Sequence, residues 1–185
     1  MTVKDILKLT CEFVGEREIL SKLITSSSLT EREQEKLNIM TNCFNLINQE
    51  IASDYLPFLT KEEIVVEKST IDFLDLSKRV VNVYEIRDKF GKNLRFRNFS
   101  NYIEVFGKAK TIVYSYLPNN FAVEDEVEMY NGLSARVYAY GVASEYLLVD
   151  GLSEDAAIWE NRFKDSLFVL SRKRGEHLMP KRRWF

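Results

Sequence analysis

The chain has 185 residues, of which 45% are hydrophobic, and a formal net charge of −2. This length supports one well-packed core and a small additional domain. The near-neutral net charge gives no overall signal of nucleic-acid binding. No apolar run approaches the ~18 residues of a membrane span, and no basic start followed by an apolar block indicates a secretory leader.

The first residues have helical spacing. Thr2 can cap a helix whose apolar stripe ends at Gly15, a residue that favours the left-handed conformation at a helix end. A short second helix is expected over about 16–24, followed by a flexible joint of three serines at 26–28. The chain therefore begins with a pair of short helices.

A longer helix should follow. Thr30 and Glu33 have the spacing of a capping box, in which two side chains satisfy each other's backbone N–H groups. The apolar stripe behind them continues to about Tyr55. Cys11 and Cys43 fall in separate predicted helices, so we expect buried free thiols rather than a disulfide.

The period changes after Pro57. From 61 to 117 the side chains alternate as they do in strands, and residues 88–91 fit a type I turn, with Asp first and Gly fourth. Five or six short strands over this span predict a small antiparallel sandwich or curled sheet. The apolar residues that share a face are Ile64 with Val66, Leu94 with Phe96, Ile103 with Val105, and Ile112 with Tyr114 and Tyr116.

Two further helices are expected from 133 to 171, joined by a tight corner at Asp150-Gly151. The first has one apolar stripe and a second stripe of small residues, so it should be buried on more than one side. In the second helix, Glu160 and Lys164 should form an i,i+4 pair. The apolar stripes are Leu133, Val137, Tyr140, Ser144 and Leu147 in the first helix and Ala156, Trp159, Phe163, Leu167 and Leu170 in the second; the small residues are Ala135, Ala139 and Ala143.

These elements predict an α+β fold: a bundle of about five helices, with a small antiparallel β domain inserted between the third and fourth helices and an extended C-terminal arm. The predicted parts are residues 1–57 and 122–171 for the bundle, 58–121 for the β domain and 172–185 for the arm. The arm carries six Lys/Arg against one acid, Glu176. A terminus whose charge opposes that of the body suggests docking onto a neighbour.

Catalytic chemistry has little support in the sequence. The lone histidine, His177, has no Cys, Asp or Glu at ligand spacing, and no Gly-rich loop joins a strand to a helix. We therefore predict no catalytic residue, no metal and no cofactor. Arg95, Arg97 and Tyr102 on a strand face could form a weak platform for single-stranded nucleic acid, although a polar outer sheet face explains them more simply.

The order of elements resembles that of the head–tail adaptor proteins of short-tailed bacteriophages, also called tail tubular protein A or gatekeeper proteins. The residues that carry the resemblance are the link Tyr116-Leu117-Pro118, the run 135–146, the helix with Trp159, Phe163 and Leu167, and the end Lys181-Arg182-Arg183-Trp184-Phe185. The resemblance implies a ring, commonly of twelve copies, between the portal and the tail nozzle. Such a ring extends the DNA channel and is the platform for tail assembly; the family supplies no catalytic residues.

On this interpretation the partners are other copies of the chain, the portal protein, a tail nozzle or tube protein, and DNA that passes without sequence-specific binding. The protein would be made in the host cytoplasm and act in the virion, with no membrane contact. Portal binding is assigned to the arm residues Arg172, Lys173, Arg174, Lys181, Arg182, Arg183, Trp184 and Phe185, and subunit contacts to Ala135, Ala139, Ala143 and Tyr146. The alternatives are a single-stranded nucleic-acid or protein binding module and, with no supporting spacing, an enzyme whose site is assembled from distant acids.

Overall fold

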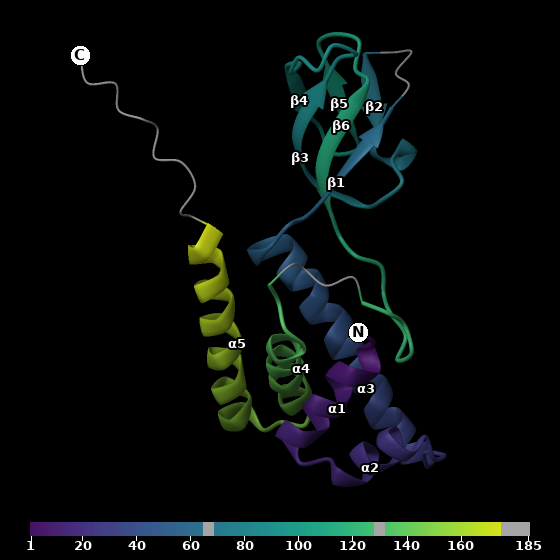
Figure 1. Ribbon diagram of the computed structural model, residues 1–185, viewed down its shortest axis with the longest axis vertical. Coiled ribbons are helices and arrows are strands. Elements are labelled where there is room, and N and C mark those ends of the chain that lie inside the picture. The colour runs from purple at the N-terminus through teal and green to yellow at the C-terminus, as the bar shows by residue number, and fades with distance from the viewer. Residues whose placement is uncertain (65–68, 128–131, 175–185) are drawn as a thin grey trace, which may run out of the picture. The chain divides into compact units, whose positions relative to one another are not determined.

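The computed structural model describes residues 1–64, 69–127 and 132–174, with side chains in the last helix described as far as Leu170. The chain divides into two compact units, each with its own core (Figure 1). Unit 1 comprises Met1–Asn48 and Asn120–Phe185, and unit 2 comprises Gln49–Asn119. The architecture is α+β, and the β domain is inserted between the third and fourth helices, as predicted.

The helices that precede the insertion are α1 (Val3–Val14), α2 (Arg17–Thr25) and α3 (Glu31–Glu50). Thr2 caps α1 as predicted: its Oγ1 accepts a hydrogen bond from the Asp5 N–H at 3.3 Å, and the Thr2 N–H donates to the Asp5 carboxylate. Gly15 ends the helix with φ +79°, where a side chain would be strained.

The predicted capping box of α3 is also present. The Thr30 N–H donates to Glu33 Oε2 at 2.6 Å, and the Glu33 N–H donates to Thr30 Oγ1 at 3.4 Å. The sequence places the end of this helix correctly near Tyr55, but the last turn, Ile51–Tyr55, is a π-helix rather than an α-helix. Because a π turn shifts the hydrogen bonds by one residue, apolar periodicity alone could not distinguish it.

Unit 2 holds two three-stranded antiparallel sheets, with the strand orders β1-β6-β3 and β2-β5-β4. The short turn Phe73–Asp75 follows β2. Phe58 at the start of β1 lies opposite Tyr116 at the end of β6, so the chain leaves the unit beside the place where it entered. The strands are β1 (Phe58–Glu63), β2 (Thr70–Asp72), β3 (Val80–Arg87), β4 (Phe96–Asn98), β5 (Tyr102–Val105) and β6 (Thr111–Tyr116).

The faces predicted for the strands are confirmed where the residues are described. Ile103, Val105, Ile112 and Tyr114 are buried, while Leu94 and Phe96 pack against the same core; Val66 lies outside the described residues. The predicted turn at 88–91 is present: the Gly91 N–H donates to the Asp88 carbonyl at 3.1 Å.

Unit 1 is completed by α4 (Ala135–Val149) and α5 (Ser153–Arg174), which pack on each other, while α4 also packs on α1 (Figure 1). The start of α4 was predicted two residues too early. Buried Leu133 precedes the helix rather than belonging to it. The corner is as expected, with Gly151 at φ +78°, and Lys164 forms an ion pair with Glu160.

Candidate functional site

The small-residue stripe of α4 lies inside unit 1. Ala139 and Ala143 are fully buried and Tyr146 nearly so, and only Ala135 of the four predicted interface residues is partly exposed. The other three are therefore covered within a single chain and present no surface to another copy. Close helix packing explains their size, because large side chains would hold the neighbouring backbones apart.

Tyr146 links α4 to α3 through Glu16. Its hydroxyl donates to Glu16 Oε1 at 2.9 Å, and the same carboxylate oxygen accepts from Lys36. Burial, followed by the hydrogen bond to Glu16 and the charge of that residue, raises the pKa of Tyr146 well above its usual range. A tyrosine held neutral in this way acts as a hydrogen-bond donor that fixes α4 to α3 through the residue before α2.

The two thiols are buried and free, as predicted. Burial raises the pKa of Cys11 to about 12, with a further contribution from the charge of Glu16, and raises that of Cys43 to about 11. A thiol needs its thiolate form to react, so neither is a candidate nucleophile near neutral pH.

Most of the predicted arm lies outside the residues that the structure describes. α5 continues to Arg174, so the backbone of Arg172, Lys173 and Arg174 is helical rather than part of an extended arm, and the helix ends immediately before Gly175. Residues 175–185, with Lys181, Arg182, Arg183, Trp184 and Phe185, lie outside the described residues.

The candidate site that the described residues do build is on unit 2, on the outward side of the sheet β2-β5-β4. In β4 and β5 the residues alternate between the core and this side: Phe96 lies opposite buried Val105, whereas Arg97 lies opposite Glu104. The Phe106 N–H donates to the Arg95 carbonyl at 2.9 Å, which continues the ladder by one pair. We call this surface the outer face; it comprises Thr70, Asp72, Arg95, Arg97, Phe99, Tyr102, Glu104 and Phe106.

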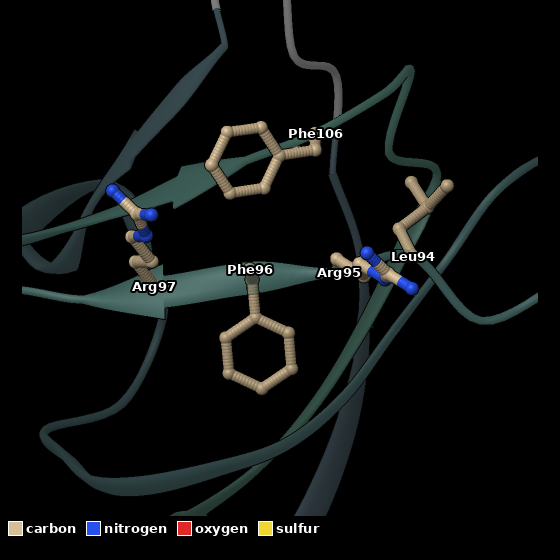
Figure 2. A pocket seen from close by; sticks show the side chains of 5 residues that line it. All are labelled: Leu94, Arg95, Phe96, Arg97 and Phe106. Carbon is tan, nitrogen blue, oxygen red and sulfur yellow. The ribbon is translucent and has the colours of Figure 1, made fainter.

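Three residues of the outer face, Arg95, Arg97 and Phe106, line an open hollow of about 710 Å³, together with Leu94 and Phe96, which also pack against the core. Figure 2 shows Phe96 on one side of β4, with Arg97 and Phe106 on the other. The Arg97 guanidinium lies 5.6 Å from the centre of the Phe106 ring, within cation–π range.

Two more aromatic residues stand at the other end of the same hairpin. The rings of Phe99 and Tyr102 are stacked, with their centres 4.6 Å apart and an angle of 13° between their planes. Because both side chains are exposed, this stack presents a flat aromatic surface to solvent. The outer face therefore carries aromatic rings at both ends, with Arg97 between them and Arg95 opposite Phe106.

The charge around this hairpin is strongly biased. Residues 87–110 contain seven Lys/Arg but only two acids, Asp88 and Glu104. Within the described part of the chain, neither Arg95 nor Arg97 forms an ion pair, although Glu104 lies opposite Arg97 in the ladder. Both guanidinium groups are exposed and can accept an anionic partner.

The sequence identified part of this surface. Arg95, Arg97 and Tyr102 were expected on one strand face, and the structure brings them together. Phe99 and Phe106 were missed, although Phe106 stands two and four positions beyond Glu104 and Tyr102 in the strand alternation. Their proximity depends on the register between β4 and β5, which the alternation of one strand does not fix.

The described ranges contain no cluster of three or more His, Cys, Asp or Glu side chains placed to hold a metal ion. None of the described helices is long and apolar enough to cross a membrane. No protein-family model matches the chain, and no curated protein matches it.

Proposed function

We propose that this chain is a structural virion protein: a head–tail adaptor whose copies form a ring below the portal of a short-tailed bacteriophage. The observation that supports the proposal is the layout of the fold, in which a helical bundle is interrupted between α3 and α4 by a compact β unit. That order is the one on which the resemblance to tail tubular protein A rests, together with the helix of residues 135–146.

The proposed partners are further copies of the chain, twelve in a complete ring, the portal protein above and a nozzle or tube protein below. DNA would pass through the channel without sequence-specific binding. Unit 1 encloses its own apolar residues around α4, so a free subunit has a core before any ring exists. A ring that assembles only on the portal needs subunits that are already folded as monomers. The role needs no catalytic residue, metal or cofactor.

A contact surface between copies is available at the corner of α4 and α5. Leu148, Val149 and Leu152 are large apolar residues that remain exposed, with exposed fractions of 49%, 61% and 49%, and Asp150 and Glu154 adjoin them. Apolar residues rimmed by charges are typical of protein contacts. In a ring each subunit would place this corner against a different surface of the next, giving a heterologous interface that closes by rotation.

The test is to combine the purified subunit with the portal protein encoded near its gene and to examine the product by native mass spectrometry and negative-stain microscopy. A homogeneous ring on the portal is expected. Val149→Lys should prevent ring closure without unfolding the subunit, because the side chain is exposed. Asn161→Lys, at another exposed position, on α5 and away from the corner, is the matched control.

One result would contradict the adaptor role, and another would contradict only the contact at the corner. A subunit that stays monomeric with the portal at concentrations above about 100 μM, where contacts of the usual interface size are populated, is not an adaptor. Ring formation that Val149→Lys leaves intact would keep the adaptor role but move the contact away from the corner.

A further inference from the structure

We propose that the outer face of unit 2 binds single-stranded nucleic acid, with its aromatic rings stacking on bases and Arg95 and Arg97 contacting phosphates. This activity is independent of the adaptor role. It concerns one surface of unit 2, and it can be tested without assembling a ring.

The first argument is the exposure of the rings. Phe106 is 52% exposed, on the side of the sheet opposite to the core that Val105 helps to form. Large aromatic side chains left in water next to arginines are the feature that proteins use to stack unpaired bases, since every base has a flat apolar face. Phe106 offers one such surface, and the stacked pair of Phe99 and Tyr102 offers another.

The second argument is spacing. Tyr102 and Phe106 stand on the same side of the same strand, four residues apart, which corresponds to about 13 Å at the rise of a β-strand. Between them on the neighbouring strand lies Arg97, whose guanidinium is 5.6 Å from the Phe106 ring centre. A strand of a few nucleotides can thus place one base at each end and a phosphate near the centre.

The third argument is charge, which also selects the occupant. The basic bias of residues 87–110 disfavours the chain's own basic arm, 172–185, and favours a polyanion. A duplex supplies the phosphates but keeps its bases stacked inside, away from Phe106. Single strands supply both groups, and nothing on the outer face distinguishes ribose from deoxyribose, so DNA and RNA are both candidates.

Two carboxylates oppose the ligand. On the outer side of the sheet, Glu104 lies directly across the ladder from Arg97, and Asp72 of β2 lies across from Tyr102. Both should repel phosphate and limit the affinity, and replacing Glu104, the acid beside Arg97, gives a variant expected to bind more tightly. A substitution that merely disturbs the fold would not tighten binding, so Glu104→Gln tests directly whether phosphate lies beside this residue.

The experiment measures fluorescence anisotropy of the full chain with labelled fifteen-nucleotide oligo(dT) and oligo(rU). Micromolar binding is expected at 50 mM NaCl for both. With two phosphates contacted, the slope of log affinity against log salt should be about −1.4, which corresponds to a roughly sevenfold loss between 50 and 200 mM. Arg95→Gln with Arg97→Gln should weaken binding and flatten that slope.

Stacking is tested separately. Phe106→Ala should reduce the affinity about fivefold or more at every salt concentration, whereas Phe106→Trp should preserve it. Phe90→Ala is the matched control, because Phe90 is 82% exposed but lies in the turn before β4, away from the outer face. Circular dichroism and thermal melts check that each variant folds. Glu104→Gln should tighten binding several-fold.

Three results would overturn the proposal. One is the absence of binding to either oligonucleotide at 1 mM protein. Another is binding that Phe106→Ala leaves unchanged but that disappears when Lys181, Arg182 and Arg183 are replaced by Gln, which would assign it to the arm. The third is equal or tighter binding of a fifteen-base-pair duplex or of poly-glutamate, which would reduce the surface to a general anion patch.

Discussion

At the scale of single residues, Gly141 in the middle of α4 marks a close approach of helices in unit 1. A Cβ built at this position would lie 2.9 Å from Ile47 Cγ2 and 3.1 Å from Phe163 Cε2, so α4 meets both α3 and α5 there. Glycine in the interior of a helix costs up to about 1 kcal/mol relative to alanine. Its presence in a central buried helix is explained by this double contact.

Gly141→Ala should therefore destabilise the protein, by about 1–3 kcal/mol, despite the gain in helix propensity. Urea unfolding followed by circular dichroism measures the change. Ile47→Val removes the Cδ1 atom, which a Cβ at 141 would meet at 3.0 Å, so the penalty should shrink in that background. A rise in stability on Gly141→Ala would show that the helices can separate at no cost.

A second residue-scale feature is the carboxylate of Glu33. Hydrogen bonds from Lys22 and then from the Thr30 backbone and hydroxyl lower its pKa to about 2, from an ordinary value of 4.5. A folded-state pKa below the unfolded value stabilises the fold above about pH 4.5, and this contribution is lost as the pH falls toward 2.

Glu33→Gln keeps a capping-box side chain but removes the charge. The variant should be less stable than the wild type at pH 7, and the difference should disappear between pH 4.5 and pH 2. Thermal melts across this range measure it. Glu35→Gln, an exposed neighbour in the same turn of α3, is the control and should show no such trend. A constant difference at all pH values would mean that the Lys22 contact does not depend on the charge of Glu33.

At the scale of elements, the sequence predicted those boundaries that have a local chemical cause. Thr2 and Gly15 bound α1, Thr30 and Glu33 start α3, and Pro57 precedes β1, each through its own backbone or side-chain chemistry. It could not tell which elements cover the stripes of α4. That depends on α1 and α5, whose packing on α4 is a property of the folded chain.

The insertion provides a direct test at this scale. Phe58 and Tyr116 are paired in one antiparallel ladder, where opposite Cα atoms are about 5 Å apart. Replacing residues 58–116 by a short Gly/Ser linker should therefore leave a helical protein that melts cooperatively, because the core of the β unit is built from its own residues. Far-UV circular dichroism and calorimetry check this. Loss of all helical signal would mean that unit 1 needs the sheets to fold.

At the scale of the whole molecule, charge is distributed in opposing blocks. Residues 172–185 carry a formal charge of +5 and the rest of the chain −7. The last four residues combine two arginines with Trp184 and Phe185, and Trp and Arg are residue types that dominate binding hot spots. In the proposed adaptor, this end docks into a groove of the portal with its arginines against acids at the rim.

Trp184→Ala should then weaken portal binding by about 2 kcal/mol or more at any ionic strength. Arg182→Ala with Arg183→Ala should matter chiefly at low salt, because exposed ion pairs are screened. Co-sedimentation with the portal measures both, and His177→Ala in the same segment is the matched control. If removal of residues 176–185 leaves binding unchanged, the docking surface lies on the helices.

The pairing of Phe58 with Tyr116 also bears on the order in which the protein folds. α1 packs on α4 although the whole β unit separates them in the chain, and the entropy lost in closing such a loop rises by about 0.6 kcal/mol with each doubling of its length. Once β1 has paired with β6, the paired strands bring the two ends of the insertion together. The loop that must then close between α3 and α4 consists only of the residues that join these helices to β1 and β6. We therefore expect sheet formation to precede closure of the bundle. The slowest steps would be the non-local strand pairings of unit 2, even though more of the described residues lie in helices than in strands.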